Sequence, residues 1–109
     1  MTKRDWKTVN ACRKPFCERC GRPANIEPHH IFTRGAGGRD IRENLVQLCT
    51  DCHIGAHSGH VSRDSLVHIV AVREHYSDEY VYAVNRAAMG YDVEIPDETE
   101  ENEQTTLVW

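Results

Sequence analysis

The apolar residues in the second half of the chain recur at the spacing of an α-helix. One stretch contains Leu66, Ile69, Val70 and Arg73, and a second contains Tyr80, Val81, Val84 and Ala88. Ser62 or Asp64 precedes the first stretch and Ser77 precedes the second, and these residue types cap helix N-termini. Gly90 follows the second stretch, where glycine commonly ends a helix. The pattern predicts two supporting helices within residues 62–89.

Shorter apolar runs occupy the first half of the chain. Residues 26–32 and 44–48 predict two strands, and the glycine-rich residues 33–43 between them predict an exposed loop. Thr50 or Asp51 can cap a helix that follows the second strand. We therefore expect a hairpin covered by one helix.

The N-terminal segment mixes apolar and basic side chains. Trp6, Val9 and Arg13 fall at helical spacing, and Pro15 follows them at a position where a helix would end. An amphipathic helix is therefore expected within residues 3–14.

Composition limits the class of protein. Of 109 residues, 39% are hydrophobic and 7% are aromatic, which suits one small domain whose thin core would gain from a bound metal. We expect a single domain over residues 1–90 with its core at 16–58, and a mobile acidic tail over 91–109. No apolar run approaches the roughly 20 residues that span a bilayer, and the first residues lead into no signal-peptide core. A cytoplasmic protein without a membrane partner is expected.

The formal charge is divided unevenly along the chain. Residues 1–60 carry ten Lys or Arg against six Asp or Glu, whereas residues 61–109 carry three against eleven. The first half is therefore positive by four charges and the second negative by eight. Only the first half suits an anionic partner such as nucleic acid.

Four of the five cysteines form two Cys-x-x-Cys pairs, Cys17 with Cys20 and Cys49 with Cys52. In an intracellular chain this arrangement favours metal over disulfides, and four thiolates are what a closed, tetrahedral zinc site requires. We therefore expect a structural Zn²⁺ without an open coordination position. Cys12 is left over and is interpreted as a small apolar core residue.

Histidines lie between and after the cysteine pairs. Neighbouring side chains on a strand point to opposite faces, so of His29 and His30 one can bind a metal while the other keeps a nitrogen free. His53 and His57 are four residues apart and share one face of the predicted helix. If that helix packs across the hairpin, it meets His29, and three imidazoles leave open positions on a metal. That arrangement is typical of a catalytic site.

The order of these motifs resembles the HNH endonuclease family, whose ββα-metal finger is framed in many bacterial and phage members by a four-cysteine zinc site. The resemblance covers about residues 16–58. Its motifs are Cys17-x-x-Cys20, Glu27-Pro28-His29-His30-Ile31, Gly37-Gly38, Asn44-Leu45-Val46-Gln47-Leu48-Cys49 and Cys52-His53. The fold it implies is a small α+β finger with flanking helices.

The resemblance implies a role for each matching residue. His29 matches the first metal ligand and His30 the general base. His53 matches the last metal ligand, and His57 matches an additional helix histidine of colicin-type DNases. Asn44 matches the central Asn, which in some members holds the loop and hairpin together and in others is itself a ligand. Both interpretations of Asn44 stay open at the level of sequence.

The implied activity is metal-dependent hydrolysis of DNA phosphodiester bonds, by nicking or double-strand cleavage, with little sequence specificity. One catalytic divalent metal is needed, with Mg²⁺, Mn²⁺, Ni²⁺ and Zn²⁺ as candidates. Arg34, Arg39 and Arg42 lie in the predicted loop, where they either grip phosphates or form a solvated surface. A homodimer that cuts both strands is also left open.

Two other classes of protein use paired cysteines. A non-catalytic zinc module that binds nucleic acid or protein would need the cysteines but not the histidines in this order. A redox protein is disfavoured because the pairs follow no βαβ pattern and match each other.

Overall fold

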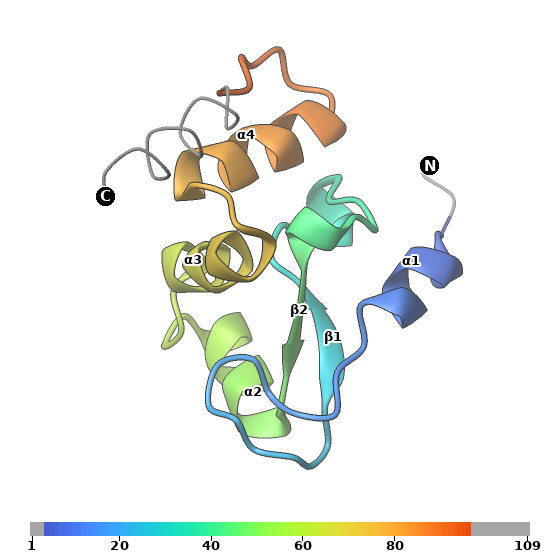
Figure 1. The fold of residues 1–109 in the computed structure, drawn as a ribbon, viewed down its shortest axis with the longest axis vertical. Coiled ribbons are helices and arrows are strands. Elements are labelled where there is room, and N and C mark those ends of the chain that lie inside the picture. The colour runs from blue at the N-terminus through green and yellow to red at the C-terminus, as the bar shows by residue number, and fades with distance from the viewer. Residues whose placement is uncertain (1–3, 97–109) are drawn as a thin grey trace, which may run out of the picture.

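The computed structural model describes residues 4–96 and contains two strands and four α-helices (Figure 1). They are α1 (Trp6–Ala11), β1 (Glu27–His30), β2 (Leu45–Leu48), α2 (Thr50–Ser58), α3 (Arg63–Glu74) and α4 (Asp78–Ala88). The predicted small α+β fold is confirmed. Within residues 4–96, no helix is both long and apolar enough to cross a membrane. Most of the expected acidic tail, residues 97–109, lies outside the described residues, so the expected boundary between domain and tail stays a prediction.

The two strands form an antiparallel hairpin with helices on both sides (Figure 1). On one face, Leu45 packs with Val9 of α1 and with Cys12, both of which are buried. On the other face, Val46 and Leu48 join the main core with α2, α3 and α4. Every residue of β2 is therefore buried, including the polar Gln47.

The hairpin loop is only partly exposed: residues 33, 35–37 and 42 are exposed as expected, whereas Gly38 and Asp40 are buried. It contains two short 3₁₀ turns, Arg34–Ala36 and Arg42–Asn44. Asp40 between them is only 5% exposed. A Cβ atom at Gly38 would lie 1.7 Å from the carbonyl oxygen of Phe32, so only glycine fits there. The close approach brings the loop backbone onto the end of β1.

The predicted elements of the first half are correct in type but differ at their ends. α1 is shorter than residues 3–14, because Asp5 caps it by accepting a hydrogen bond from the Thr8 amide. β1 is shorter than residues 26–32. For α2, neither Thr50 nor Asp51 is the cap: Cys49 occupies that position without a capping side-chain hydrogen bond. Tertiary contacts override local capping at this residue.

The supporting helices begin where the sequence predicts. Ser62 caps α3 and Ser77 caps α4, each through its side-chain oxygen. The predicted stripe of α4 is partly wrong, because its buried residues are Val81 and Asn85. The Asn85 side chain donates to the carbonyl oxygens of Glu43, at 2.8 Å, and Val81, at 3.0 Å. A polar residue therefore joins α4 to the hairpin loop.

A buried guanidinium links α3 to the first half of the chain. Nη1 of Arg73 donates to both carboxylate oxygens of Glu18, at 3.1 and 3.0 Å, and to the carbonyl oxygen of Leu45 at 3.0 Å. Its Nη2 donates to the carbonyl oxygen of Arg42 at 2.8 Å. The side chains of Arg73 and Glu18 are 13% and 5% exposed. The pair lies between the first cysteine pair, the hairpin and α3.

We expect Arg73→Ala to lower the free energy of unfolding by about 3 kcal/mol, because it leaves a buried carboxylate without its cation. Arg42→Ala is the matched control. It removes an ion pair to Glu74 from a side chain that is 48% exposed, and it should cost less than about 1 kcal/mol. Urea unfolding followed by circular dichroism measures both. Equal losses of unfolding free energy in the two variants would show that the buried ion pair stabilises the fold no more than the exposed one.

Candidate functional site

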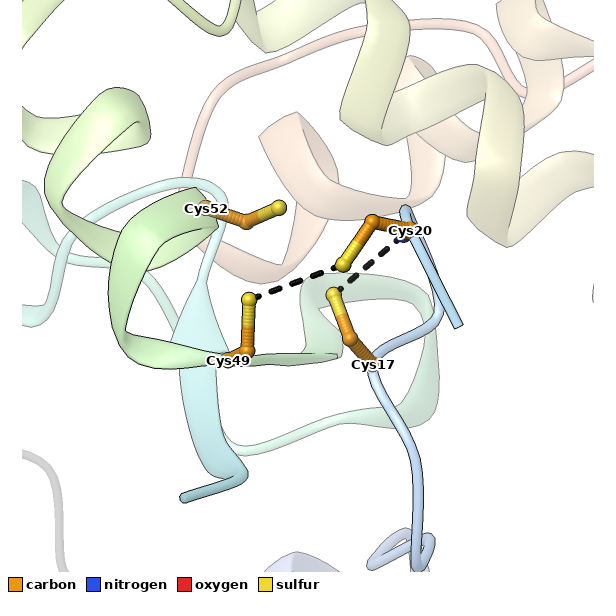
Figure 2. Close-up of side chains that lie close together, drawn as sticks. All are labelled: Cys17, Cys20, Cys49 and Cys52. Atoms are coloured by element: carbon orange, nitrogen blue, oxygen red, sulfur yellow. Dashed lines mark hydrogen bonds between the residues drawn. The ribbon is translucent and has the colours of Figure 1, made fainter. Parts of the chain in front are cut away.

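The four paired cysteines converge at one end of the hairpin (Figure 2). Cys17 and Cys20 come from the segment before β1, and Cys49 and Cys52 from the junction of β2 and α2. The four sulfur atoms lie within 4.8 Å of one another, and those of Cys20 and Cys49 are 3.6 Å apart. Sulfurs bound at about 2.3 Å to one tetrahedral zinc ion lie roughly 3.8 Å apart. The cluster therefore fits a four-thiolate metal site.

The surroundings of the cluster favour thiolates unequally. Burial would raise the pKa of the Cys17 thiol, but backbone N–H groups, those of Cys20 and Cys49 foremost, lower it to about 6. Burial, and after it the neighbouring thiols, raise the pKa of Cys52 to about 12, although Arg19 donates to its sulfur at 3.4 Å. Thiolates this close repel one another, and a divalent cation offsets that repulsion. The donor set is thus suited to a cation such as Zn²⁺.

Cys12 lies outside this cluster. It is buried beside Val9 and Leu45, and burial raises the pKa of its thiol. The interpretation of Cys12 as an apolar core residue agrees with this position.

Three histidines form a second cluster, which joins β1 to α2. The ring centroid of His29 in β1 lies 5.0 Å from that of His53 and 5.2 Å from that of His57, both in α2. Their candidate ligand nitrogens all lie within 4.8 Å of one another, and Nε2 of His53 is 3.1 Å from Nε2 of His57. Nitrogens bound at about 2.1 Å to one tetrahedral ion lie roughly 3.4 Å apart. The structure thus brings together the three predicted metal ligands.

The surroundings of His29 and His53 suit these two imidazoles to a metal. Burial foremost, and then the neighbouring His53 and His57, lower the pKa of His29 to about 4, so the ring is in its neutral, ligating form. Nδ1 of His53 lies 3.3 Å from a carboxylate oxygen of Glu27. Such a carboxylate orients a ligating imidazole so that its other nitrogen faces the metal. Glu27 belongs to the motif around the two histidines, but sequence reasoning gave it no role.

His30 points away from the three clustered imidazoles but lines the same cavity. Pairing of His29 with Val46 and of His30 with Leu45 places the two rings on opposite faces of β1. The cavity has a volume of about 190 Å³ and is lined by Pro28, His29, His30, Thr33, Arg34, His53 and His57. A candidate base and the candidate metal ligands therefore open onto one space.

The partner of His30 was missed by sequence reasoning. Nε2 of His30 lies 2.7 Å from Oδ1 of Asp40, whose side chain is 2% exposed. Oδ2 of the same carboxylate accepts from the Asp5 amide at 2.8 Å and pairs with Arg4 and Arg34, at 3.3 and 3.0 Å. An acid two residues after Gly38 was the sequence signal, but it was interpreted as part of an exposed loop. In the structure it is buried among donors.

Asn44 holds the loop to the hairpin, and its side chain lies outside the histidine cluster. Its Oδ1 accepts from the Phe32 amide at 2.7 Å, while its Nδ2 donates to the carbonyl oxygens of Phe32 and Arg39, at 2.9 and 3.0 Å. The residue is fully buried. The geometry favours the holding role over the ligand role.

The three loop arginines occupy different places. Arg34 lines the cavity that contains His30. Arg39 contributes its carbonyl oxygen to the Asn44 side chain, and Arg42 pairs with Glu74. Their assigned contacts to phosphates stay predictions, with Arg34 the best placed of the three.

A further arginine flanks the histidine cluster. Arg63 begins α3 and stacks on the ring of Phe32, with its guanidinium carbon 4.7 Å from the ring centroid. It lines a second cavity of about 270 Å³ that is also bordered by His29, Thr33 and His57. Sequence reasoning assigned Arg63 no role, because only the packing of α3 brings it beside the histidines.

Comparison with known proteins finds a family model that matches part of the chain. Residues 17–59 match the family model described as HNH endonuclease. A curated relative, the Type IV methyl-directed restriction enzyme EcoKMcrA of Escherichia coli (strain K12), is 36% identical over 53 residues. The match covers 40% of this chain and 19% of that enzyme, so the chain spans about a fifth of the relative's length. No solved structure gave a significant match.

The resemblance to the HNH endonuclease family is confirmed over residues 17–59. This segment contains β1, β2 and α2, together with both cysteine pairs and the three clustered histidines. The family match supports a nuclease role in general, and the roles of individual residues stay predictions.

Cys49→Ser should lose tightly bound zinc and unfold the domain, because three thiolates and a hydroxyl no longer close the site. Cys12→Ser is the matched control, since it changes the same atoms at a buried cysteine outside the cluster. Metal content after gel filtration and the melting temperature measure the effect. Retention of a full equivalent of zinc by Cys49→Ser would contradict the assignment.

Proposed function

We propose that the protein is a metal-dependent endonuclease that hydrolyses DNA phosphodiester bonds with little sequence specificity. The observation that carries this proposal is the shared cavity, in which His30 lies opposite a cluster of three imidazoles. A zinc module without catalytic activity would account for the four cysteines, but it has no use for a second, separate donor cluster beside a fourth histidine. The nuclease interpretation uses every member of both clusters.

The three imidazoles are suited to a catalytic metal more than to a structural one. His29 is 7% exposed, whereas His57 is exposed and lies at the edge of the cavity. A site built from three neutral nitrogens leaves positions for water and a phosphate oxygen. A single divalent ion such as Mg²⁺, Mn²⁺, Ni²⁺ or Zn²⁺ would supply Lewis-acid stabilisation of charge on the phosphate and the leaving oxygen.

His30 is assigned the role of general base. Its Nε2 is occupied by the Asp40 carboxylate, so Nδ1 is the nitrogen that can accept a proton from water. A neutral imidazole is the most frequent general base in enzymes, and the cavity gives water access to this ring. His29, on the opposite face of the strand, is engaged with α2 and does not compete for the same proton.

Two arginines would hold the nucleic acid on either side of the histidines. Arg34 lines the cavity on the His30 side, and Arg63 lines the cavity on the His57 side. Phosphate contacts of this kind position the backbone without reading bases, which agrees with low sequence specificity. DNA is the proposed substrate because the matched relative is a restriction enzyme.

We expect the protein to nick supercoiled plasmid with at least one of Mg²⁺, Mn²⁺, Ni²⁺ and Zn²⁺, and EDTA to stop the reaction. His30→Ala should lower the rate by about 10²–10⁴-fold, because it removes the general base. His68→Ala is the control, since His68 lies on α3 and its side chain is 65% exposed. The proposal fails if no metal supports nicking, or if His30→Ala nicks as fast as the His68 control.

Arg63→Ala should weaken binding of a short DNA duplex and lower the slope of log Kd against log salt by about one, since one phosphate contact is lost. Arg86→Ala is the matched control. Arg86 also stacks on Phe32, at 5.0 Å, but it lines a different cavity with Asp64 and Asp78. Fluorescence anisotropy over a salt series, with zinc-loaded protein and no other divalent ion added, measures both variants. An unchanged slope for Arg63→Ala would exclude a phosphate contact.

A further inference from the structure

The Asp40 carboxylate divides its two oxygen atoms between two tasks. Oδ2 accepts hydrogen bonds from the Asp5 amide at 2.8 Å and from Arg34 at 3.0 Å, and it forms an ion pair with Arg4 at 3.3 Å. Oδ1 contacts Nε2 of His30 at 2.7 Å. One oxygen is therefore fixed to the protein by donors from two segments of the chain, and the other is presented to an imidazole.

The charge of Asp40 is maintained by these partners. Burial would raise the pKa of the carboxyl, but the Asp5 amide, His30 and the two arginines outweigh burial and lower it. Because an ionised carboxylate only accepts hydrogen bonds, Nε2 of His30 must carry the hydrogen. The ring is then held in one orientation and one tautomer, with an unprotonated Nδ1.

We propose that Asp40 is a positioning residue for the cleavage reaction: it holds the His30 ring so that an unprotonated Nδ1 faces the cavity. This inference rests on the proposed function, in which His30 is the general base. The same carboxylate pairs with Arg34, which lines the cavity. One buried group therefore fixes the positions of both the base and an adjacent cation. Asp40 itself lines neither histidine cavity and acts through its neighbours.

A purely structural role would leave the contact to His30 unexplained. The loop is already joined to the hairpin by Asn44, through three hydrogen bonds to backbone groups. The contact at Oδ1 of Asp40 adds nothing to that connection, because its partner is a side chain that ends in the cavity.

Asp40→Asn is the most informative substitution. It preserves the shape of the side chain but replaces one acceptor oxygen with an NH₂ donor. Two hydrogen-bond donors and the Arg4 cation surround the position of Oδ2, so the amide oxygen will take that position. The amide NH₂ then faces His30 and donates to Nε2, which moves the ring hydrogen to Nδ1. The base is present but holds its proton on the wrong nitrogen.

We expect Asp40→Asn to lower kcat by about 10²-fold or more, while KM changes less than about threefold, because the amide oxygen still accepts from Arg34 and only the base is impaired. In a His30→Ala background the same substitution should have no further effect on kcat, since Asp40 would act through an absent ring. Asp78→Asn is the matched control. Asp78 also contacts an imidazole, with Oδ1 3.0 Å from Nδ1 of His68, but on the outer side of α3 and α4, and it should leave kcat unchanged.

Long-range ¹H–¹⁵N correlation of the histidine rings in the zinc-loaded protein gives a readout independent of cleavage. His30, assigned by comparison with His30→Ala, should carry its hydrogen on Nε2 in the wild type and on Nδ1 in Asp40→Asn. A wild-type ring with its hydrogen on Nδ1 would overturn the inference. So would a full kcat in Asp40→Asn, or an equal loss in the His30→Ala background.

Failure of the proposed function gives a different result. If His30→Ala cleaves as fast as the wild type, His30 is not the base and the catalytic part of the inference falls with that assignment. If His30→Ala is impaired and Asp40→Asn is not, the function stands and only the role of Asp40 is wrong. Zinc content and melting temperature of each variant separate both results from a loss of folding.

Discussion

The side chain of Asn44 is the constraint on which the geometry of the site depends. Its three hydrogen bonds join the end of β1 to the loop that precedes β2, at a fully buried position. Because the loop is held there, Asp40 reaches His30 ten residues earlier in the chain. All three partners of this buried amide are backbone groups. Its removal is costly, because each backbone group left unpaired destabilises the fold by about 1–3 kcal/mol. The cavity is therefore defined by a residue that does not line it.

The two donor clusters share α2 but differ in the softness of their ligands. Cys52 and His53 are adjacent on this helix, and they face the sulfur cluster and the nitrogen cluster respectively. Thiolates select ions such as zinc, and imidazoles with open positions accept a wider range of divalent ions. The two donor sets therefore differ in the range of metal ions that each prefers.

Local patterns in the sequence were sufficient to predict the caps at Ser62 and Ser77, the strand pair and the convergence of the three histidines. These features depend on spacing within one element, or on the alternation of a strand. The burial of Asp40 depends on Arg4, Arg34 and the Asp5 amide, which no local pattern connects. Asn85 was missed for the same reason: its partner is the carbonyl of Glu43, 42 residues earlier. The periodicity of apolar residues does not predict contacts of polar side chains with partners far away in the chain.

The contacts of Arg73 show that residues 17–59 are not a self-contained unit. The segment that matches the family ends at residue 59. Arg73 lies beyond it, yet it supplies the cation for Glu18 and donates to the carbonyl oxygens of Arg42 and Leu45. A transplant of residues 17–59 alone would carry a buried anion without its counter-ion. The smallest unit that could be moved intact into another scaffold therefore extends through α3.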